Sequence, residues 1–521
     1  MLSETNPSKT YFMIPAMPTP NGRLHLGHIG GPFLAVDVLA RHLRLAGHKT
    51  VVISGTDSYD SYITGQSVKE NKTPAEICNH YHEGIASDLA AMQIGFDRFV
   101  NPLSSEWAPT YRNWHDRVLN QLKESGITSV QEETVALDDE SGRFLTGCWL
   151  PGSCPNCSAA VCGYFCEDCG SHFRPEEVID APKTKQKRRV RNLFMSLPQQ
   201  SNLDGRGLDP TILAVYNMFA KGNNSLLRLT ANSEWGMKIE NQEEGDRFFN
   251  YPFAYAYALM LGELAGKIAG KDVNALGADS GIVTVGAFGI DNTIPVLGSI
   301  EGITDSLKQY KQFDYYLVNH FLTLEGSKFS TSRRHAIWVE DVARVGASSD
   351  IVRLFLAGIE THEAAGDVSY ARLVEFYNRT VDWIDRLLVN AMSKVFTHND
   401  ANGKQFITEK LDALLSRQEQ SLDPAGYRLA NASAVIEEWI ALGEELNQYT
   451  ETYFWWMQGL VLLAYPFMPR LAETLWAKLG YSGEPRIAEF GTLPQAAIQR
   501  DLPTNLKRLK ATDFAALAEK V

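Results

Sequence analysis

Two short segments, about three hundred residues apart, carry side chains suited to handling phosphate groups. In the first, His25 and His28 flank Leu26-Gly27 at the start of an apolar run. A helix that begins there would offer free N–H groups and a positive dipole end, which favour phosphate. The imidazoles can donate hydrogen bonds to a transferring nucleotide, and Gly27 leaves room for a purine. The second segment, Lys328-Phe329-Ser330-Thr331-Ser332, adds a cation and hydroxyl groups. We expect the two segments to meet over one nucleotide; alternatively, the histidines lie on an ordinary surface turn.

Four further side chains have the spacing of a metal knuckle. The pattern Cys154-x2-Cys157-x8-Cys166-x2-Cys169 places two thiolates on each of two tight turns, which suits one tetrahedral Zn²⁺. Four protein ligands leave no open position, so we expect a structural zinc site rather than a hydrolytic one. Cys162, inside the loop, could compete as a ligand. The other cysteines, expected in the core or on the surface, are Cys78 and Cys148.

The elements that must position the histidines form a predicted βαβ unit. The apolar run Tyr11–Ile14 indicates a buried strand, and Pro18, Pro20 and Gly22 break it. Helical spacing over Ile29–Leu45 and a second apolar run, Lys49–Ser54, complete the unit. Further helices are predicted over 88–96, 110–126 and 251–270, further strands over 281–288 and 315–324, and helices throughout the chain from Ala371.

Composition is that of an ordinary globular protein of several domains. The chain has 521 residues, of which 44% are hydrophobic and 21% charged. No apolar run approaches the roughly 18 residues that span a bilayer, and Met1 to Lys9 lacks a signal-peptide core. We therefore expect a cytoplasmic protein without a membrane partner. The net charge of −13 argues against a generally basic surface, but the stretch Lys183–Arg191 is a local candidate for binding tRNA or another polyanion; otherwise it is a solvated loop.

Taken together, the motifs resemble those of class I aminoacyl-tRNA synthetases, and of the methionyl-tRNA synthetase group in particular. The two signature segments correspond to the HIGH and KMSKS motifs of that class. Pro18–Gly22, Gly55-Thr56-Asp57 and Phe288–Asn292 also look like the family, as does the cysteine knuckle. The motifs occur in the family's order over most of the chain.

The resemblance implies an α/β fold: a Rossmann-like catalytic domain, a zinc-knuckle connective insertion and a C-terminal all-α bundle. The expected parts are the first catalytic half over 1–117, the insertion over 118–245, the second catalytic half over 246–315, a stem-contact region over 316–370 and the anticodon-binding-like helices over 371–521. Because the chain stops soon after these helices, without the extra tRNA-binding module of some relatives, a monomer is expected.

The resemblance also implies roles for individual residues. The activity would be activation of an amino acid by ATP with Mg²⁺, followed by transfer to tRNA. The catalytic residues would be His25, His28, Lys328, Ser330, Thr331 and Ser332. Those binding ATP would be Asn21, Gly27, Gly289, Asp291 and Arg333. Those binding the amino acid would be Met17, Thr19, Asp57, Pro252 and Tyr255, with Asp57 on the α-ammonium unless it merely caps a helix. Those binding tRNA would be Asn390, Lys394 and Trp456.

Several positions depart from the family pattern. Thr331 replaces a second lysine of the signature loop, and in the methionine pocket Thr19, Pro252 and Ala254 replace larger or polar groups. Three interpretations follow from this pattern. The chain forms methionyl-tRNA; or it activates another amino acid or uses another acceptor; or it binds RNA or a partner without catalysis.

Overall fold

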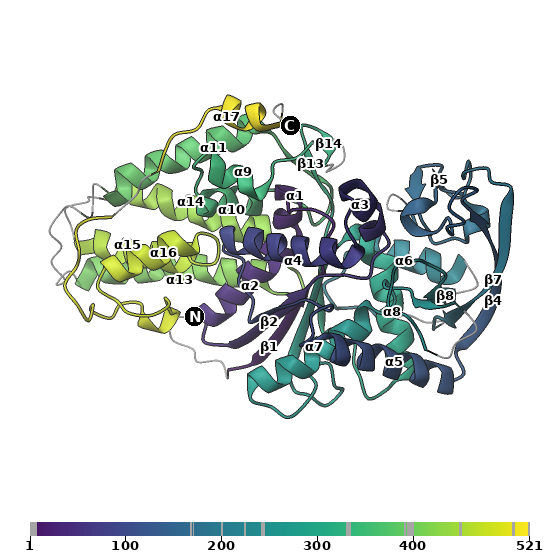
Figure 1. The fold of residues 1–521 in the computed structure, drawn as a ribbon. Helices are drawn as coiled ribbons and strands as arrows, with labels where there is room; N and C mark the ends of the chain where they lie inside the picture. Colours follow the sequence, from purple (N-terminus) through teal and green to yellow (C-terminus); the bar gives the residue numbers. More distant parts are fainter. Residues whose placement is uncertain are drawn as a thin grey trace.

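A parallel sheet lies at the centre of the structure, a computed structural model (Figure 1). The residues that it describes are 8–166, 169, 171–198, 202–222, 226–240, 245–329, 335–389, 392, 401–446, 451–502 and 506–518. Five strands of this part of the chain form the sheet in the order β12-β11-β1-β2-β3, and every neighbouring pair is parallel. Their bounds are β1 Thr10–Pro15, β2 Lys49–Gly55, β3 Arg98–Val100, β11 Val283–Gly289 and β12 Tyr315–Asn319.

The strand order reverses at β1, which pairs with β11 on one side and β2 on the other; Met13 of β1 is opposite both Val285 and Val52. At such a switch point the connections leave in opposite directions, so a crevice opens beyond the carboxyl ends of the two central strands. In this chain the crevice lies where β1 ends at Pro15 and β11 ends at Gly289.

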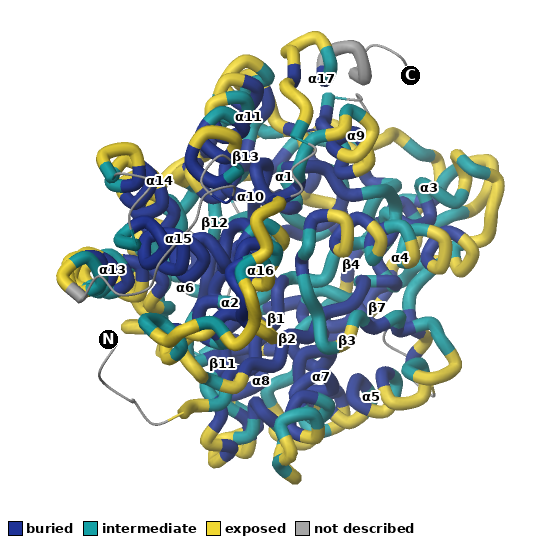
Figure 2. The backbone as a smooth tube through the Cα atoms, turned by 90° about the vertical axis from the view of Figure 1, so that its left-hand side faces the viewer, coloured by how far each residue is buried: buried dark blue, intermediate teal, exposed yellow. Residues whose placement is uncertain are grey.

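Helices cover both faces of the sheet because the strand residues are apolar in both directions. Phe12 and Ile14 of β1 belong to one core, and Tyr11 and Met13 to the other, as the alternation of side chains along a strand requires. The first core contains residues of the helices α5 (Ala108–Glu124), α7 (Ala254–Ala269) and α8 (Thr293–Ser306). The second contains residues of α2 (Leu34–Leu45) and continues into the C-terminal helices. Figure 2 shows the central strands β1, β2 and β11 as largely buried.

An insertion projects from one end of the sheet, at the right in Figure 1. Its framework is the antiparallel sheet β4-β7-β8, in which β4 (Thr128–Leu137) and β7 (Gln186–Ser196) pair along their whole common length. Arg228 and Glu133 form a buried ion pair between β8 and β4. The smaller elements of this region are β5 Pro151–Ser153, β6 Ala160–Cys162, α6 Pro210–Gly222, β8 Leu226–Arg228, β9 Thr230–Ala231 and β10 Arg247–Phe248.

The remaining elements lie between and beyond these parts. Before the insertion come α1 Leu26–His28, a π-helical segment Ile29–Phe33, α3 Tyr62–Glu70 and α4 Pro74–Ala91. After the main sheet, β14-β13-β15 form a small sheet from Ser327–Lys328, Leu322–Leu324 and Gly366–Val368, and α9 Val339–Arg344 and α10 Ser349–Ala357 follow β14 in the chain. The C-terminal bundle comprises α11 Tyr370–Trp383, a π-helical segment Ile384–Val389, α13 Ala401–Leu422, α14 Leu429–Glu445, α15 Glu451–Ala464, α16 Pro469–Lys478 and α17 Ala511–Ala518.

One buried arginine joins the bundle to the sheet domain. Arg353 of α10 is 0% exposed, and its Nη2 atom lies 2.7 Å from a carboxylate oxygen of Asp37 in α2. The same guanidinium donates to the carbonyl oxygens of Met92, Pro466 and Phe467. A buried charge is tolerated only when paired and hydrogen-bonded, and here the partners come from three separate parts of the chain.

Several sequence predictions of local structure were wrong, each for an identifiable reason. The helix predicted over 88–96 is instead the end of α4, which begins at a capping box of Thr73 and Glu76 and ends before Gln93, a residue with φ of 58°. The strand predicted over 315–324 is two strands in two sheets, β12 and β13. The helix predicted over 29–45 is interrupted at Gly31, where ψ is −131° just before Pro32.

Three predicted domain boundaries also fall inside elements, and the one at 370/371 separates only the first residue of α11 from the rest. Residues 118–124 belong to α5, and Val118, Leu119 and Leu122 pack in the core of the parallel sheet. The insertion therefore begins after α5 rather than at 118. The boundary at 315/316 divides β12, which is a strand of the parallel sheet.

No helix among the described residues is both long enough and apolar enough to cross a membrane.

Candidate active site and metal centre

A cleft of about 710 Å³ opens at the carboxyl ends of β1 and β11. Segments from distant parts of the chain line it: the turn after β1, the start of α1, the loops after β2 and β11, and β14. Of the residues predicted to be functional, the cleft brings together Met17, Thr19, Asn21, His25, Gly27, His28, Asp57, Gly289, Asp291 and Lys328. The cleft thus coincides with the crevice expected from the strand order.

The two histidines lie against each other at the start of α1. Their rings stack with centroids 3.7 Å apart, and the backbone N–H of His25 donates to Nδ1 of His28 over 3.2 Å. The preceding residues are fixed by α4, because Asp88 accepts hydrogen bonds from the Arg23 guanidinium and the Leu24 N–H.

Burial controls the protonation of both rings. It lowers the pKa of His28 to about 4 and, together with the neighbouring His28 ring, holds the pKa of His25 well below its usual value. Both imidazoles are therefore neutral near pH 7. Because Nδ1 of His28 accepts a hydrogen bond, its single ring proton is assigned to Nε2, which can then donate to an anion.

Phe329 of the second signature segment, and residues that follow this segment in the chain, both contact the first segment. Phe329 stacks on the His25 ring, with centroids 4.8 Å apart and planes inclined by 16°. Beyond the signature loop, Trp338 forms a β-bridge with His25, and Leu26 N–H donates to the Ile337 carbonyl over 2.9 Å. Lys328 lines the cleft with its Nζ atom 4.4 Å from the centre of the Phe321 ring. Ser330, Thr331, Ser332 and Arg333 lie outside the described residues.

Two glycines permit close approaches in this region. A Cβ atom on Gly27 would lie 3.0 Å from ring atoms of both His25 and Phe329, so a side chain there would press on the contact between the two segments. A Cβ atom on Gly289 would lie 2.5 Å from a carboxylate oxygen of Asp291. Glycine at 289 therefore leaves the space that the Asp291 side chain occupies at the edge of the cleft.

Two predicted substrate residues do not line the cleft. Tyr255 is buried in α7 and its hydroxyl donates to the Lys311 carbonyl, while the Pro252 carbonyl accepts from the Ser299 hydroxyl. This corrects the prediction for both residues, whose polar atoms are used inside the core. The neighbouring Tyr251, Ala254 and Tyr257 line the cleft instead, because successive residues at the start of a helix point in different directions.

Among the polar residues of the cleft that sequence reasoning missed are Asp60, Asn250 and Tyr251. The Asn250 amide donates to Asp57 over 2.6 Å and lies 3.4 Å from Asp60. Asp60 also accepts hydrogen bonds from the Tyr251 hydroxyl at 3.1 Å and from the Tyr62 N–H at 2.8 Å. Asp60 is only 2% exposed. The spacing of Asp57 and Asp60 was a weak signal, since nothing in the sequence shows that Asn250 lies beside both carboxylates.

The carboxylate pair makes a pH-dependent contribution to stability. Burial, and then the neighbouring Asp60 carboxylate, raise the pKa of Asp57 to about 7. A carboxyl group with a raised pKa in the folded state stabilises the fold at low pH, and this contribution is lost as the pH rises through about 7.

We therefore expect Asp57→Asn to raise the melting temperature at pH 8 by about 2–4 °C and to have a smaller effect at pH 5, where the wild-type pair already holds a proton. Asparagine can still accept the hydrogen bond from Asn250. Differential scanning calorimetry at the two pH values measures both differences. A gain that is equal at both, or larger at pH 5, would contradict the assigned repulsion.

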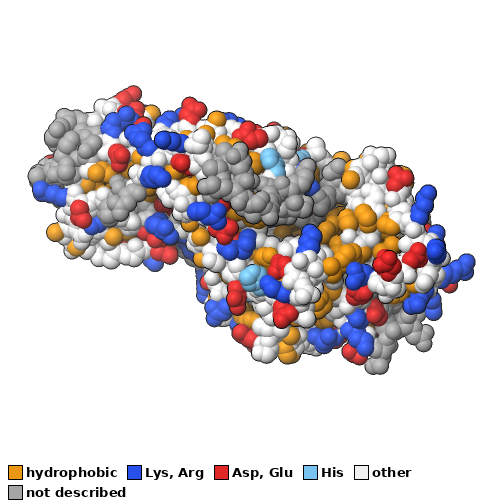
Figure 3. Space-filling model, turned by 45° about the horizontal axis from the view of Figure 1, so that its top comes forward, with side chains coloured by type: hydrophobic (Ala, Val, Ile, Leu, Met, Phe, Trp, Pro, Cys, Tyr) orange, Lys and Arg blue, Asp and Glu red, His pale blue; other side chains and the backbone are white. Residues whose placement is uncertain are grey.

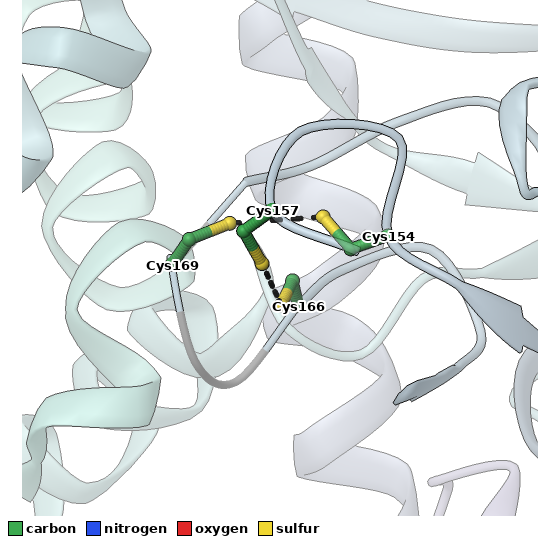
Figure 4. Close-up of side chains that lie close together, drawn as sticks. All are labelled: Cys154, Cys157, Cys166 and Cys169. Atoms are coloured by element: carbon green, nitrogen blue, oxygen red, sulfur yellow. Dashed lines mark hydrogen bonds between the residues drawn. The ribbon is translucent and has the colours of Figure 1, made fainter. Parts of the chain in front are cut away.

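The four predicted zinc ligands converge in the insertion (Figure 4). The sulfur atoms of Cys154, Cys157, Cys166 and Cys169 all lie within 4.8 Å of one another, with 3.7 Å between those of Cys154 and Cys169 and 3.6 Å between those of Cys157 and Cys166. Four thiolates around Zn²⁺ at 2.3 Å have sulfur atoms about 3.8 Å apart. The donor set therefore fits one tetrahedral zinc ion. Cys162 is not part of the group; its thiol lies 3.0 Å from the Cys148 carbonyl oxygen.

Purified protein is expected to contain about one zinc per chain, because all four sulfur donors are in place. Cys154→Ser should release the metal and lower the melting temperature of the insertion. Cys162→Ser is the matched control and should keep the full zinc content. Elemental analysis and calorimetry measure the two effects; metal-free protein of unchanged stability would rule out the site.

The residues predicted to bind tRNA have different placements. Asn390 and Lys394 lie outside the described residues. Trp456 of α15 is 0% exposed, and its indole N–H donates to the Trp439 carbonyl over 2.8 Å. A ring without exposed surface cannot stack on a base, so this prediction is corrected: Trp456 is a core residue of the bundle.

The basic stretch is partly a strand rather than a loop. Its residues from Gln186 onward belong to β7, and the side chains of Lys187, Arg189 and Arg191 are exposed. Alternation along the strand places these three on one face. Figure 3 shows Lys and Arg side chains among Asp and Glu side chains at the right-hand end of the molecule, where the insertion lies.

Comparisons with known proteins agree with this architecture. The family model described as tRNA synthetases class I (M) matches residues 11–247 and 300–395. The chain is 26% identical over 518 residues to the methionine--tRNA ligase of Thermoplasma volcanium, covering 89% of this chain and 91% of that protein. It is 26% identical over 576 residues to that of Roseiflexus castenholzii, covering 98% and 92%. The structure of Mycobacterium tuberculosis methionyl-tRNA synthetase in complex with methionyl-adenylate superposes with a TM-score of 0.71 at 15% identity, covering 96% of this chain and 99% of that one.

Proposed function

The chain belongs to the class I tRNA synthetase family, and on this premise we propose that it activates an amino acid with ATP and transfers the aminoacyl group to tRNA. The observation that supports this most strongly is the meeting of the two signature segments. The stack of Phe329 on His25 closes one side of a cleft at the carboxyl ends of the central strands. Relatives that match nearly the whole chain are methionine--tRNA ligases, so methionine is the first amino acid to test.

In the activation step, the amino-acid carboxylate attacks the α-phosphorus of ATP and pyrophosphate leaves. The mixed anhydride that forms then passes its acyl group to a hydroxyl of the acceptor, releasing AMP. The protein's part is to position the reactants and to neutralise developing charge. Mg²⁺ would accompany the triphosphate as its counter-ion.

In this proposal each of the predicted residues has a task. The Nε2–H of His28, assigned above, donates to the α-phosphate while its Nδ1 holds the His25 backbone N–H. The His25 ring, stacked on that of His28, would stabilise the transition state at the same phosphate. Lys328, together with Ser330, Thr331, Ser332 and Arg333, would hold the pyrophosphate. Asp291, beyond the end of β11, would accept the ribose hydroxyls, and Asn21 and Gly27 would contact the nucleotide from the other strand end. Asp57 would bind the substrate α-ammonium, with Met17 and Thr19 beside it.

For the acceptor, the exposed face of β7 offers a row of cations. Lys187, Arg189 and Arg191 can neutralise backbone phosphates of RNA, an interaction that depends on local charge rather than on the net charge of −13. The placement of the insertion beside the cleft supports a contact with the end of the tRNA that receives the acyl group. A monomeric, cytoplasmic protein stays a prediction.

The test is ATP–pyrophosphate exchange across a panel of amino acids, followed by charging of methionine tRNAs. We expect exchange that depends on one amino acid. Methionine-dependent exchange with charging of both initiator and elongator tRNA would identify a methionine--tRNA ligase; exchange without charging would identify an activating enzyme with another acceptor. No exchange with any amino acid would overturn the proposal and leave a binding role.

A further inference from the structure

The cleft contains two carboxylates where one substrate α-ammonium needs only one. Asp57 and Asp60 both line it, and a single amide, that of Asn250, contacts both. In the part of the chain that the structure describes, neither carboxylate forms an ion pair with a lysine or arginine, unlike Asp88 or Asp37, which lie against Arg23 and Arg353. The pair therefore has hydrogen-bond donors around it but no positive charge.

This arrangement leaves a charge to be balanced. If Asp57 binds the α-ammonium, as the proposed function requires, the cleft still holds one negative charge on Asp60. The Asp60 side chain is buried, with only 2% of its surface exposed. Hydrogen bonds from its neighbours offset part of the cost of this buried charge, and a cation bound beside the carboxylate would offset more. Burial does raise the pKa of Asp60 above its usual value.

The surroundings favour a cation over an apolar group. Aromatic rings of Tyr62, Tyr111, Phe165, Tyr251 and Tyr257 line the same cleft, and the faces of such rings attract ammonium groups. Phe165 and Tyr251 lie with ring centroids 4.9 Å apart, and the Tyr251 hydroxyl contacts Asp60 directly. A thioether or alkyl end would bring no donor to this carboxylate, whereas an ammonium brings three.

One buried polar atom beside the same cleft lacks a hydrogen-bond partner in the described part of the chain. Nδ1 of His25, on a ring that is 7% exposed, has no hydrogen-bond partner among the described residues although it lines the same cleft. A buried polar atom of this kind ordinarily has a partner. The acidic pair lines the same cleft as this group, so it is not an incidental cluster on the surface.

We propose that the amino-acid pocket takes a diamino acid, with Asp57 holding the α-ammonium and Asp60 holding a second ammonium at the end of the side chain. The inference rests on the proposed function for the role of Asp57. It adds the class of substrate, which differs from that of the relatives in carrying two positive charges. It also makes Asp60 the residue that determines specificity.

Matched pairs of amino acids that differ only in the terminal ammonium test this directly. The pairs are lysine with norleucine, ornithine with norvaline, and 2,4-diaminobutyrate with 2-aminobutyrate; methionine is added as the substrate of the relatives. Isothermal titration calorimetry of the full-length protein at pH 7.5 measures the affinity of each. We expect the dicationic member of at least one pair to bind about tenfold or more tightly than its neutral partner, and more tightly than methionine.

Asp60→Asn should abolish that ratio while keeping the acceptor for the Tyr62 N–H, and Asp279→Asn, an exposed residue outside the cleft, should leave it unchanged. A ratio that survives in Asp60→Asn would overturn the assignment, as would tighter binding of the neutral member in every pair. If the Asp60 variant does not fold, the affinities of the matched amino acids for the wild-type protein test the proposal on their own.

The exchange assay separates this inference from the function on which it rests. Exchange with methionine, together with tighter binding of the neutral members, leaves adenylation in place and overturns the diamino-acid pocket. Tight binding of a diamino acid without exchange for it supports the pocket and overturns the proposed adenylation.

Discussion

His28→Asn is expected to slow ATP–pyrophosphate exchange by about 10²–10³-fold. This is the usual effect of removing one preorganised hydrogen-bond donor from a site where negative charge develops in the transition state. The backbone N–H of His25 donates to Nδ1 of His28, and burial lowers the pKa of that ring to about 4, so Nε2 carries the proton that faces the nucleotide. Asparagine can keep the acceptor for the His25 N–H because its side-chain oxygen reaches the same position. It cannot reach the phosphate.

Glutamine is the informative counterpart, because its amide nitrogen reaches about as far as Nε2. His28→Gln should retain exchange within about tenfold of the wild type, and His80→Ala, an exposed position on α4, should retain all of it. Melting temperatures of the three variants show whether folding is intact. Equal exchange by the asparagine and glutamine variants would mean that Nε2 does not donate to the reacting phosphate.

Arg353→Ala is expected to destabilise the protein by about 3–5 kcal/mol, because a buried carboxylate loses one charged partner and buried carbonyl groups lose their donor. Asp37 loses one of its two arginine partners, since Arg41 remains 2.8 Å from it, and three carbonyl groups lose a donor. Because these groups belong to the sheet domain, to the loop after α4 and to the bundle, the bundle should unfold more independently of the sheet domain.

Arg379→Ala provides the comparison. Arg379 pairs with Glu437 on the surface, with both side chains more than half exposed at 65% and 61%, and such pairs contribute about 0.2–1 kcal/mol. Urea unfolding followed by circular dichroism measures both variants. A loss in Arg353→Ala no larger than in Arg379→Ala would show that the buried network does not join the domains.

The sequence was sufficient where a local pattern determines the structure. Strands β1, β2 and β11 lie within a residue or two of their predicted bounds because each is a short apolar run between breakers. The paired cysteines were likewise predictable, since two tight turns fix their spacing. The start of α4 could also have been predicted, because Thr73-Pro74 followed by Glu76 is a capping box with proline at the first helical position.

Other features depend on contacts that no local pattern encodes. Trp456 aligned with a base-stacking residue, yet α15 is buried from Tyr453 to its end and the indole contacts α14. Tyr255 and Tyr257 differ by two positions on α7, but only Tyr257 reaches the cleft. Asp60 gains its role from Asn250 and Tyr251, which the chain brings to it from about 190 residues away.

A crystal structure determined with ATP and Mg²⁺ tests the central claim most directly. We expect the triphosphate between the His25–His28 turn and Lys328, with the α-phosphate beside Nε2 of His28 and the ribose at Asp291. Nucleotide bound away from this cleft, with Phe329 still stacked on His25 and the cleft empty, would contradict the assignment of the two segments to one ATP.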